Sequence, residues 1–243
     1  MVPRARYPGE EYLGSLRRIA FRMKVTLTPR IKICCISSVA EAALAVECGA
    51  AALGLVSQMP SGPGVIGDEL IAEIAATVPP PIGTFLLTSR QSVRDIITQQ
   101  RYCRTNCVQI CDHLTEGTHR ELKDALPGIS IVQVVHVVGP ESVDEACAVA
   151  PHVDAILLDS GNQKLAVKEL GGTGKTHDWT LSRMIRERIE IPMFLAGGLT
   201  AENGAWAIRE VGPFGIDLCS SVRTDGRLDE DKLRRFFAAV RNC

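Results

Sequence analysis

The chain has 243 residues, with 27 basic and 28 acidic side chains and a formal net charge of −1. This balance argues against a basic nucleic-acid-binding surface and against an acidic disordered tail. No apolar run is long enough to span a bilayer, and no signal peptide is evident. We therefore expect a cytoplasmic protein that binds neither nucleic acid nor membrane. The nine cysteines include no Cys-x-x-Cys pair, which favours buried thiols over a disulfide or metal framework.

Residues 1–30 do not share the pattern of the rest of the chain. They are rich in arginine but include Glu10 and Glu11, and a regular apolar alternation begins only after Met23. Targeting peptides of organelles avoid acidic residues, which disfavours that alternative. We interpret residues 1–30 as an N-terminal extension, or as a misassigned start ahead of Met23, and residues 31–243 as one domain.

From residue 31 onward, short apolar runs alternate with segments whose apolar residues recur at helical spacing. The predicted strands are Ile31–Cys35, Ala52–Val56, Ile82–Leu87, Cys107–Ile110, Ile131–Val135, Ala155–Leu158, Met193–Ala196 and Gly215–Cys219. The predicted helices are Ser38–Cys48, Asp68–Thr77, Ser92–Tyr102, Glu116–Ala125, Ser142–Val149, Trp179–Arg188, Glu202–Glu210 and Glu230–Val240. Such alternation predicts parallel strands, and continuous apolar strands predict burial on both faces.

Strand–helix pairs in this number favour a (β/α)8 barrel, in which eight parallel strands close into one sheet. The chain length fits, because such barrels typically need about 250 residues. An open doubly wound sheet is the alternative architecture. It more often carries a Gly-x-Gly-x-x-Gly fingerprint after its first strand, and this chain has none there.

The last two predicted strands each end in small residues. The seventh runs into Gly197 and Gly198, and the eighth into Ser220 and Ser221. Backbone amides come close to phosphate oxygens only where no large side chain holds them off. Barrels of this class build phosphate sites from these two strand ends. We therefore expect a phosphorylated small molecule as the ligand of these four residues.

A glycine-rich run, residues 171–176, follows the sixth strand. Its Gly-Lys-Thr is shared with nucleotide P-loops, but no strand leads directly into it and the first glycine is misplaced. We interpret it as a flexible loop that closes over the phosphate side, with Gly172 and Gly174 in contact with the ligand. His113, His136 and His177 have no metal-binding spacing, so we predict no metal site.

Five segments carry a resemblance to a known family: KICCIS, AILLDS, GGTGKTHDW, LAGGLTAEN and FGIDLCSSV, in that order. They resemble phosphoribosylanthranilate isomerases of tryptophan biosynthesis, from about Ile31 to Arg241. The resemblance implies a (β/α)8 barrel that performs an Amadori rearrangement of an N-linked phosphoribosyl aldose without any cofactor. It further implies Asp159 as the acid and Cys34 as the base.

The rearrangement needs an acid that protonates the ring oxygen and a base that removes the C2 proton. A thiol acts as a base only when it is ionised, and we expect Lys32 to lie too deep in the strand to assist Cys34. Without the resemblance, Cys34 is a core thiol and Asp159 is a helix cap. We expect Gln109, Asp112, Asp217 and Arg90 to bind the rest of the substrate.

The chain departs from the family pattern at several positions near the site. Cys35 replaces a glycine after the base, and we expect its side chain to point away from the site. Asp112 and Ser221 also replace glycines. The loop Gln58–Ile66 lacks the arginine that meets the anthranilate carboxylate, which removes a contact of about 1.5–3 kcal/mol. We expect phosphate binding to survive and anthranilate recognition to weaken.

Two consequences follow from the missing arginine. Arg90 is a candidate to replace it, and an arginine placed at Gly62 or Gly64 should partly restore recognition.

Two other functions stay open: a phosphosugar barrel with epimerase-like or aldolase-like chemistry, and a phosphate-binding homologue without turnover. Schiff-base chemistry would need a lysine that points inward at a strand end, and the sequence places none there. We expect a monomer or a homodimer.

Overall fold

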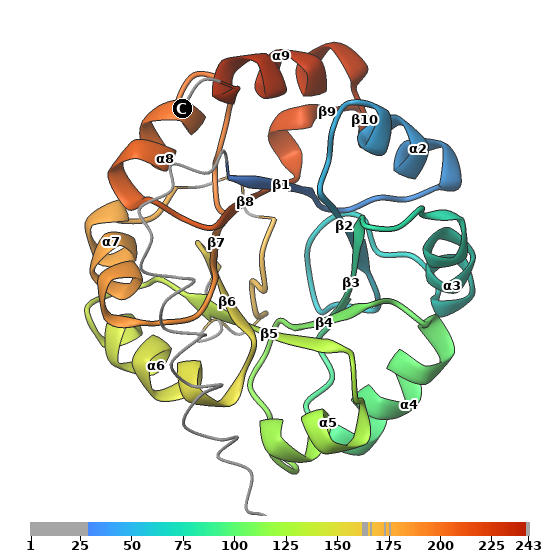
Figure 1. Ribbon diagram of the computed structural model, residues 1–243, viewed down its shortest axis with the longest axis vertical. Helices are drawn as coiled ribbons and strands as arrows, with labels where there is room; N and C mark the ends of the chain where they lie inside the picture. The colour runs from blue at the N-terminus through green and yellow to red at the C-terminus, as the bar shows by residue number, and fades with distance from the viewer. Residues whose placement is uncertain (1–28, 162–164, 166, 173, 175, 242–243) are drawn as a thin grey trace, which may run out of the picture.

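The computed structural model describes residues 29–161, 165, 167–172, 174 and 176–241. Its strands close into one parallel barrel in the order β1 to β8, which confirms the predicted fold class (Figure 1). The strands are β1 Arg30–Ile33, β2 Ala52–Val56, β3 Gly83–Thr88, β4 Cys107–Ile110, β5 Ser130–His136, β6 Ala155–Asp159, β7 Met193–Leu195 and β8 Gly215–Leu218. The predicted N-terminal extension lies outside the described residues as far as residue 28.

A ring of helices surrounds the barrel (Figure 1). The helices are α2 Val39–Glu47, α3 Asp68–Thr77, α4 Val93–Cys103, α5 His119–Ala125, α6 Glu141–Val149, α7 Trp179–Arg188, α8 Gly204–Val211 and α9 Glu230–Val240. Local capping sets several of their starts. Ser38, Thr118 and Asp229 each accept a hydrogen bond from a backbone N–H in the first turn. Helix α5 therefore starts three residues later than predicted, after Gly117 at a φ of +83°.

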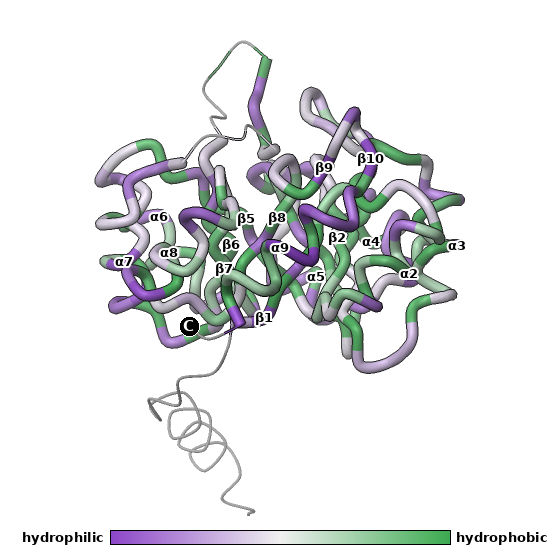
Figure 2. The backbone as a smooth tube through the Cα atoms, turned by 90° about the horizontal axis from the view of Figure 1, so that it is seen from above, coloured by the Kyte–Doolittle hydropathy of each residue, from purple (hydrophilic) through white to green (hydrophobic). Residues whose placement is uncertain are grey.

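Both faces of the strands are buried, as their continuous apolar runs predicted. One face packs against the helices, where Ile33, Leu53 and Ile156 are fully buried. The other face fills the barrel interior, where the rings of Phe85 and Phe194 meet edge to face with their centroids 5.8 Å apart. Figure 2 shows hydrophobic residues along the central strands and hydrophilic ones mostly on the outer helices and loops. The packed interior leaves room for a ligand only at the barrel mouth.

Several features were not predicted from the sequence. Short 3-10 helices form at Ala150–His152 (η1) and Ser220–Val222 (η2), and a small hairpin pairs β9 Arg223–Thr224 with β10 Arg227–Leu228. Strand β1 ends at Ile33 rather than at Cys35, because Cys35 adopts a left-handed conformation with a φ of +62°. Across the described part of the chain, none of the helices has the length and apolarity needed to cross a membrane.

Candidate active site

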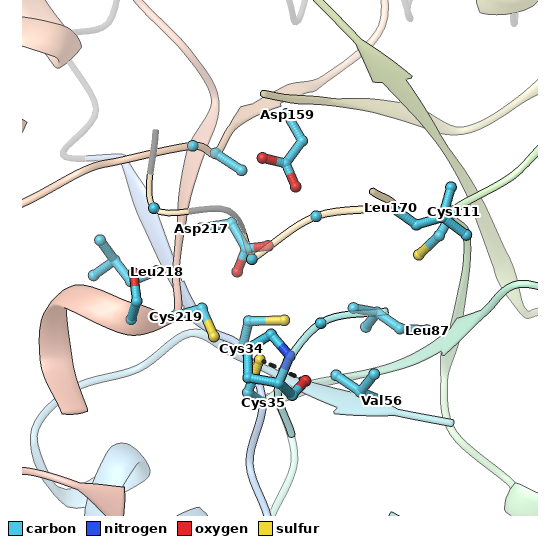
Figure 3. A pocket seen from close by; sticks show the side chains of 18 of the residues that line it. Cys34, Cys35, Val56, Leu87, Cys111, Asp159, Leu170, Asp217, Leu218 and Cys219 are labelled. Carbon is cyan, nitrogen blue, oxygen red and sulfur yellow. Dashed lines mark hydrogen bonds between the residues drawn. The ribbon is translucent and has the colours of Figure 1, made fainter. Parts of the chain in front are cut away.

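A cavity opens at the carboxyl ends of the barrel strands (Figure 3). The space between its walls is about 680 Å³, part of which is open to solvent. Its lining combines apolar side chains from β2 and β3 with small residues that follow β7 and β8. Several polar and thiol groups of the lining lie on β1, β4, β6 and β8 or just after them: Cys34, Cys35, Gln109, Cys111, Asp159, Asp217 and Cys219.

Asp159 ends β6 and points into this cavity (Figure 3). Its Oδ1 accepts a hydrogen bond of 2.7 Å from the backbone N–H of Ser160. Its Oδ2 faces Gly171, where an added Cβ would lie only 2.6 Å away. Burial raises the pKa of Asp159 above its ordinary value, although the bond from Ser160 opposes this shift. A carboxyl group in this setting keeps its proton to higher pH, as a general acid requires.

Cys34 follows β1 and shares its surroundings with Lys32. The backbone N–H of Cys34 donates to the carbonyl oxygen of Leu218 at 2.7 Å, which extends the β1–β8 pairing. A Cβ added at Gly54 of β2 would lie 2.8 Å from Cys34 Sγ and 3.1 Å from Lys32 Nζ. The thiol of Cys34 and the ammonium group of Lys32 therefore both lie close to Gly54 of β2. Lys32 is fully buried, as its position suggested, but it lies beside the thiol rather than too deep to affect it.

Lys32 is held by an ion pair across the β1–β8 seam. Its Nζ lies 2.7 Å from Asp217 Oδ2 and 5.3 Å above the centre of the Phe85 ring. Burial alone would lower the pKa of Lys32, but the carboxylate of Asp217 and the neighbouring Cys34 outweigh it and raise that pKa. The ammonium group therefore stays charged beneath the cavity.

Three polar side-chain atoms in the cavity lining are buried without a hydrogen-bond partner among the described residues. They are Asp217 Oδ1, Gln109 Oε1 and Ser221 Oγ. Buried polar atoms are normally paired, and each unpaired one costs about 1–3 kcal/mol. Their gathering on one cavity indicates a ligand that carries several hydroxyl or phosphate groups.

The predicted phosphate-binding residues come together in this cavity. Gly197 and Gly198 follow β7 at φ values of +84° and +60°, and the side chain of Asn203 donates to the Gly198 carbonyl oxygen at 2.9 Å. Ser220 and Ser221 begin η2 directly after β8.

The glycine-rich loop after β6 reaches the same side of the cavity. Gly172 and Gly174 both line the cavity, and a Cβ added at Gly174 would lie 3.4 Å from Ser220 Oγ. Thr173 and Lys175, which belong to the glycine-rich run of residues 171–176, lie outside the described residues. The loop therefore faces the phosphate side through its glycines.

The chain matches the model of the N-(5'-phosphoribosyl)anthranilate isomerase family over residues 31–239. A relative from Methanosarcina mazei, N-(5'-phosphoribosyl)anthranilate isomerase 2, is 34% identical over 215 residues, which are 88% of this chain and 94% of the relative. A relative from Halorubrum lacusprofundi is 34% identical over 211 residues, covering 86% of this chain and 95% of that protein. The chain belongs to the N-(5'-phosphoribosyl)anthranilate isomerase family.

Solved structures of the family share this barrel. The isomerase from Thermotoga maritima is 28% identical with a TM-score of 0.74, and the match covers 88% of this chain and 100% of that one. Another solved family member, 26% identical with a TM-score of 0.71 over the same shares, is in complex with reduced 1-(o-carboxyphenylamino)-1-deoxyribulose 5-phosphate. A third structure describes the Thermotoga maritima isomerase as dimeric.

Cys35, which departs from the family pattern, lines the cavity rather than pointing away from it. The expectation was wrong because β1 ends early and the left-handed backbone turns the side chain back toward the mouth. Its Sγ lies 3.6 Å from the Pro63 carbonyl oxygen (Figure 3). A hydrogen bond to Cys219 raises the pKa of Cys35 and lowers that of Cys219.

The position of Cys35 also corrects a predicted substitution. A Cβ added at Gly64 would lie 2.4 Å from Cys35 Cβ, and Gly64 has a φ of +77°, so an arginine cannot be placed there without moving Cys35. Gly62 has more room, with Gly171 oxygen 3.5 Å from an added Cβ, but its φ of +106° also disfavours a side chain.

The four predicted substrate-binding residues do not all reach the cavity. Gln109 and Asp217 line it, as described above. Asp112 lies behind the rim at the end of β4, where Lys168 Nζ is 2.6 Å from its Oδ2. Arg90 borders a separate outer hollow beside Asp68. Within the described part of the chain, no three His, Cys, Asp or Glu side chains are grouped to hold a metal ion.

One buried network near Cys34 was not predicted. The two terminal nitrogens of Arg223, Nη1 and Nη2, each donate to the Glu41 carboxylate at 3.1 Å. Nη2 also donates to the carbonyl oxygens of Cys34 and Cys35. Burial alone would raise the pKa of Glu41, but the bond from Arg223 lowers it. The guanidinium group thus holds the backbone at the end of β1. Gly54 was also missed, although a glycine inside a buried strand signals close approach of another group.

Proposed function

We propose that this chain converts N-(5'-phosphoribosyl)anthranilate into 1-(o-carboxyphenylamino)-1-deoxyribulose 5-phosphate, an aldose–ketose isomerisation of tryptophan biosynthesis. The observation that carries the proposal is that Cys34 and Asp159 face one cavity whose far side is formed by Gly197, Gly198 and Ser220. Two proton-transfer groups and a phosphate cradle around one ligand are what the rearrangement needs. Membership of the isomerase family supports the same reaction.

In the proposed reaction, Asp159 donates its proton to the ring oxygen of the ribose. The bond between C1 and this oxygen breaks, and the nitrogen lone pair forms the C=N bond of a Schiff base. The raised pKa of Asp159 keeps the donor protonated at neutral pH more often than an ordinary carboxyl group. General acid catalysis of this kind typically contributes about 10²–10⁴-fold.

Cys34 then removes the proton from C2. The electron pair of that C–H bond forms a C1=C2 bond, and the nitrogen recovers its lone pair, which gives the enolamine. Tautomerisation of the enol to the ketone completes the rearrangement, so that no atom is gained or lost and no cofactor is required. A thiol takes up a proton in this way only as a thiolate, and the ammonium group of Lys32 lies near Cys34 Sγ beside Gly54.

The remaining cavity groups orient the substrate in this proposal. The phosphate lies against the backbone amides after β7 and β8, with Ser221 and the glycines of the β6–α7 loop around it. The unpaired Asp217 Oδ1 and Gln109 Oε1 accept hydrogen bonds from the sugar hydroxyls. These contacts would hold C1 and C2 between Asp159 and Cys34.

Complementation tests the proposal directly. The full-length gene is expressed in a bacterial strain that lacks its own phosphoribosylanthranilate isomerase, and growth is followed without tryptophan. We expect growth from the wild-type gene and none from the matched Asp159→Ala variant produced at the same level. Absence of growth from well-expressed, folded wild-type protein would refute the anthranilate assignment. Retained sulfate or phosphosugar binding would then point to another phosphosugar reaction or to a barrel without turnover.

A further inference from the structure

The proposed substrate has an anionic group at each end, but the cavity offers a visible site for only one of them. Backbone amides after β7 and β8 meet the phosphate. The described residues that line the cavity include Asp159 and Asp217 but no lysine or arginine. The anthranilate carboxylate would therefore enter a partly desolvated cavity whose described lining carries no cation. A carboxylate in that position needs a cation close by.

Most cationic side chains near the cavity are held in ion pairs or lie outside the cavity. Lys32 is fully buried and pairs with Asp217. Arg223 is occupied by Glu41 and by backbone carbonyl oxygens. Arg90 lies in an outer hollow beside Asp68 and Glu69. Among the residues that the structure describes, this leaves the rim of the β6–α7 loop to be considered.

Lys168 lies on this rim with a partly exposed side chain. Its Nζ is 2.6 Å from Asp112 Oδ2, and its side chain is 37% exposed whereas that of Asp112 is 5% exposed. The Asp112 carboxylate is fixed in turn, because its Oδ1 accepts a bond of 2.9 Å from the backbone N–H of His113. The lysine is thus held by one buried carboxylate and remains open to a second one from the solvent side.

The backbone of Lys168 is tied to the cavity wall. Its carbonyl oxygen accepts a hydrogen bond of 2.6 Å from Ser61 Oγ, and Ser61 lines the cavity. Two residues further on, Leu170 lines the cavity as well. Lys168 therefore stands where the loop after β2 meets the loop after β6.

The shape of the cavity places the aromatic ring near this point. Val56, Leu87 and Leu170 form an apolar wall beneath the rim. In the closed strand order, β3 lies across the barrel from β7, so this wall faces the phosphate side. A substrate with its phosphate at β7 and β8 would therefore set its ring on the wall, with the ortho carboxylate toward the rim.

We propose that Lys168 is a specificity-determining residue that binds the anthranilate carboxylate, and that Asp112 holds its ammonium group in place for that contact. The inference rests on the proposed function, because it needs an aglycone with a carboxylate. It also gives a role to Asp112, which a glycine at the same position could not perform. The bridging ammonium group separates the substrate carboxylate from Asp112, which would otherwise repel it.

Calorimetric binding to the full chain tests this inference with two stable ligands. One is reduced 1-(o-carboxyphenylamino)-1-deoxyribulose 5-phosphate, and the other is the same compound without the carboxylate. We expect Lys168→Met to weaken binding of the carboxylated ligand about tenfold and to change binding of the other ligand less than about twofold. Lys168→Arg should keep the preference for the carboxylate. Unfolding midpoints would show that each variant is folded.

Lys123→Met is the matched control. Lys123 Nζ lies 2.7 Å from Asp154 Oδ1 and its side chain is 33% exposed, so the pair resembles the other in geometry but lies on α5, away from the cavity. This variant should bind both ligands as wild type does. Equal weakening of both ligands by Lys168→Met would overturn the inference and leave the ion pair as a tether of the loop. No change for either ligand would also overturn it.

The wild-type protein separates this inference from the proposed function. Wild type that binds neither ligand, or binds both equally, would refute anthranilate as the aglycone and with it the role of Lys168. Wild type that prefers the carboxylated ligand, with the preference kept in Lys168→Met, would refute only the role of Lys168. Each result is read from affinities and does not depend on turnover.

Discussion

We propose that the two sides of the barrel mouth recognise a ligand by different means. On the β7–β8 side, Gly197, Gly198 and Ser220 present backbone amides on short connections. On the opposite side, we propose that side chains on the loops that follow β4 and β6 bind the ligand, as at Lys168 and Asp112. A backbone cradle depends on the chain path and on small residues, so it tolerates little change. A side-chain clamp can be replaced by a group from another loop.

Removal of the two proposed proton-transfer groups, which lie between the two sides of the mouth, should have the largest effect. Cys34→Ala and Asp159→Ala should each lower kcat by about 10²–10⁴-fold, because each removes one proton transfer. Phosphate affinity should stay near that of wild type, since neither group belongs to the cradle. Steady-state kinetics and sulfate binding measure the two effects. Cys147→Ser on α6 is the control, and an unchanged kcat in the Cys34 variant would exclude it as the base.

A lower pH should affect the two sides differently, because Gly197, Gly198, Ser220 and Ser221 do not titrate whereas the β6–α7 loop contains His177. Burial lowers the pKa of His177 to about 4, and its Nε2 lies 2.7 Å from Ser182 Oγ. Because the unfolded chain binds this proton near pH 6.5, stability is full above that pH and falls as the pH drops toward 4. The loss should be at most about 3 kcal/mol.

Urea unfolding of wild type and His177→Gln over this pH range measures the contribution of His177. The difference in unfolding free energy between neutral and acidic pH should be smaller in the variant, because glutamine does not titrate. Wild type and variant with the same pH dependence would show that His177 does not link protonation to folding.

A substitution within the cradle has the smallest expected effect. Gly198→Val should weaken phosphosugar binding about tenfold, because a β-branched residue at a φ of +60° displaces the amides that meet the phosphate. Gly212→Val is the matched control, since Gly212 has a φ of +64° but caps α8 at the opposite end of the barrel. Both variants should lose similar stability, and only the first should lose affinity. Equal affinities would place the phosphate elsewhere.

Much of this architecture could be predicted from the sequence because the strands and helices follow from the local spacing of apolar residues. Continuous apolar runs gave the strands, and the rule that barrel sites lie at strand ends brought Cys34, Asp159 and Gly198 to one mouth. The end of β1 was harder, because the left-handed backbone of Cys35 is not expected of a non-glycine residue.

Contacts between distant residues left no local signal. Lys168 and Asp112 are separated by 56 positions, and Arg223 and Glu41 by 182. Charged residues on loops usually face solvent, so a sequence pattern does not identify which of them pair. The placement of Arg90 failed for the same reason, since its strand end was predicted but the direction of its side chain was not.

The bond between Arg223 and Glu41 has a kinetic consequence. It can form only after β1 and β8 have met, because Arg223 follows β8 and Glu41 lies just beyond β1. Closing so long a loop is entropically costly and comes late in folding. A contact made after the transition state leaves the folding rate almost unchanged and slows unfolding. This ion pair should therefore act mainly on how long a closed barrel persists before its first and last strands separate.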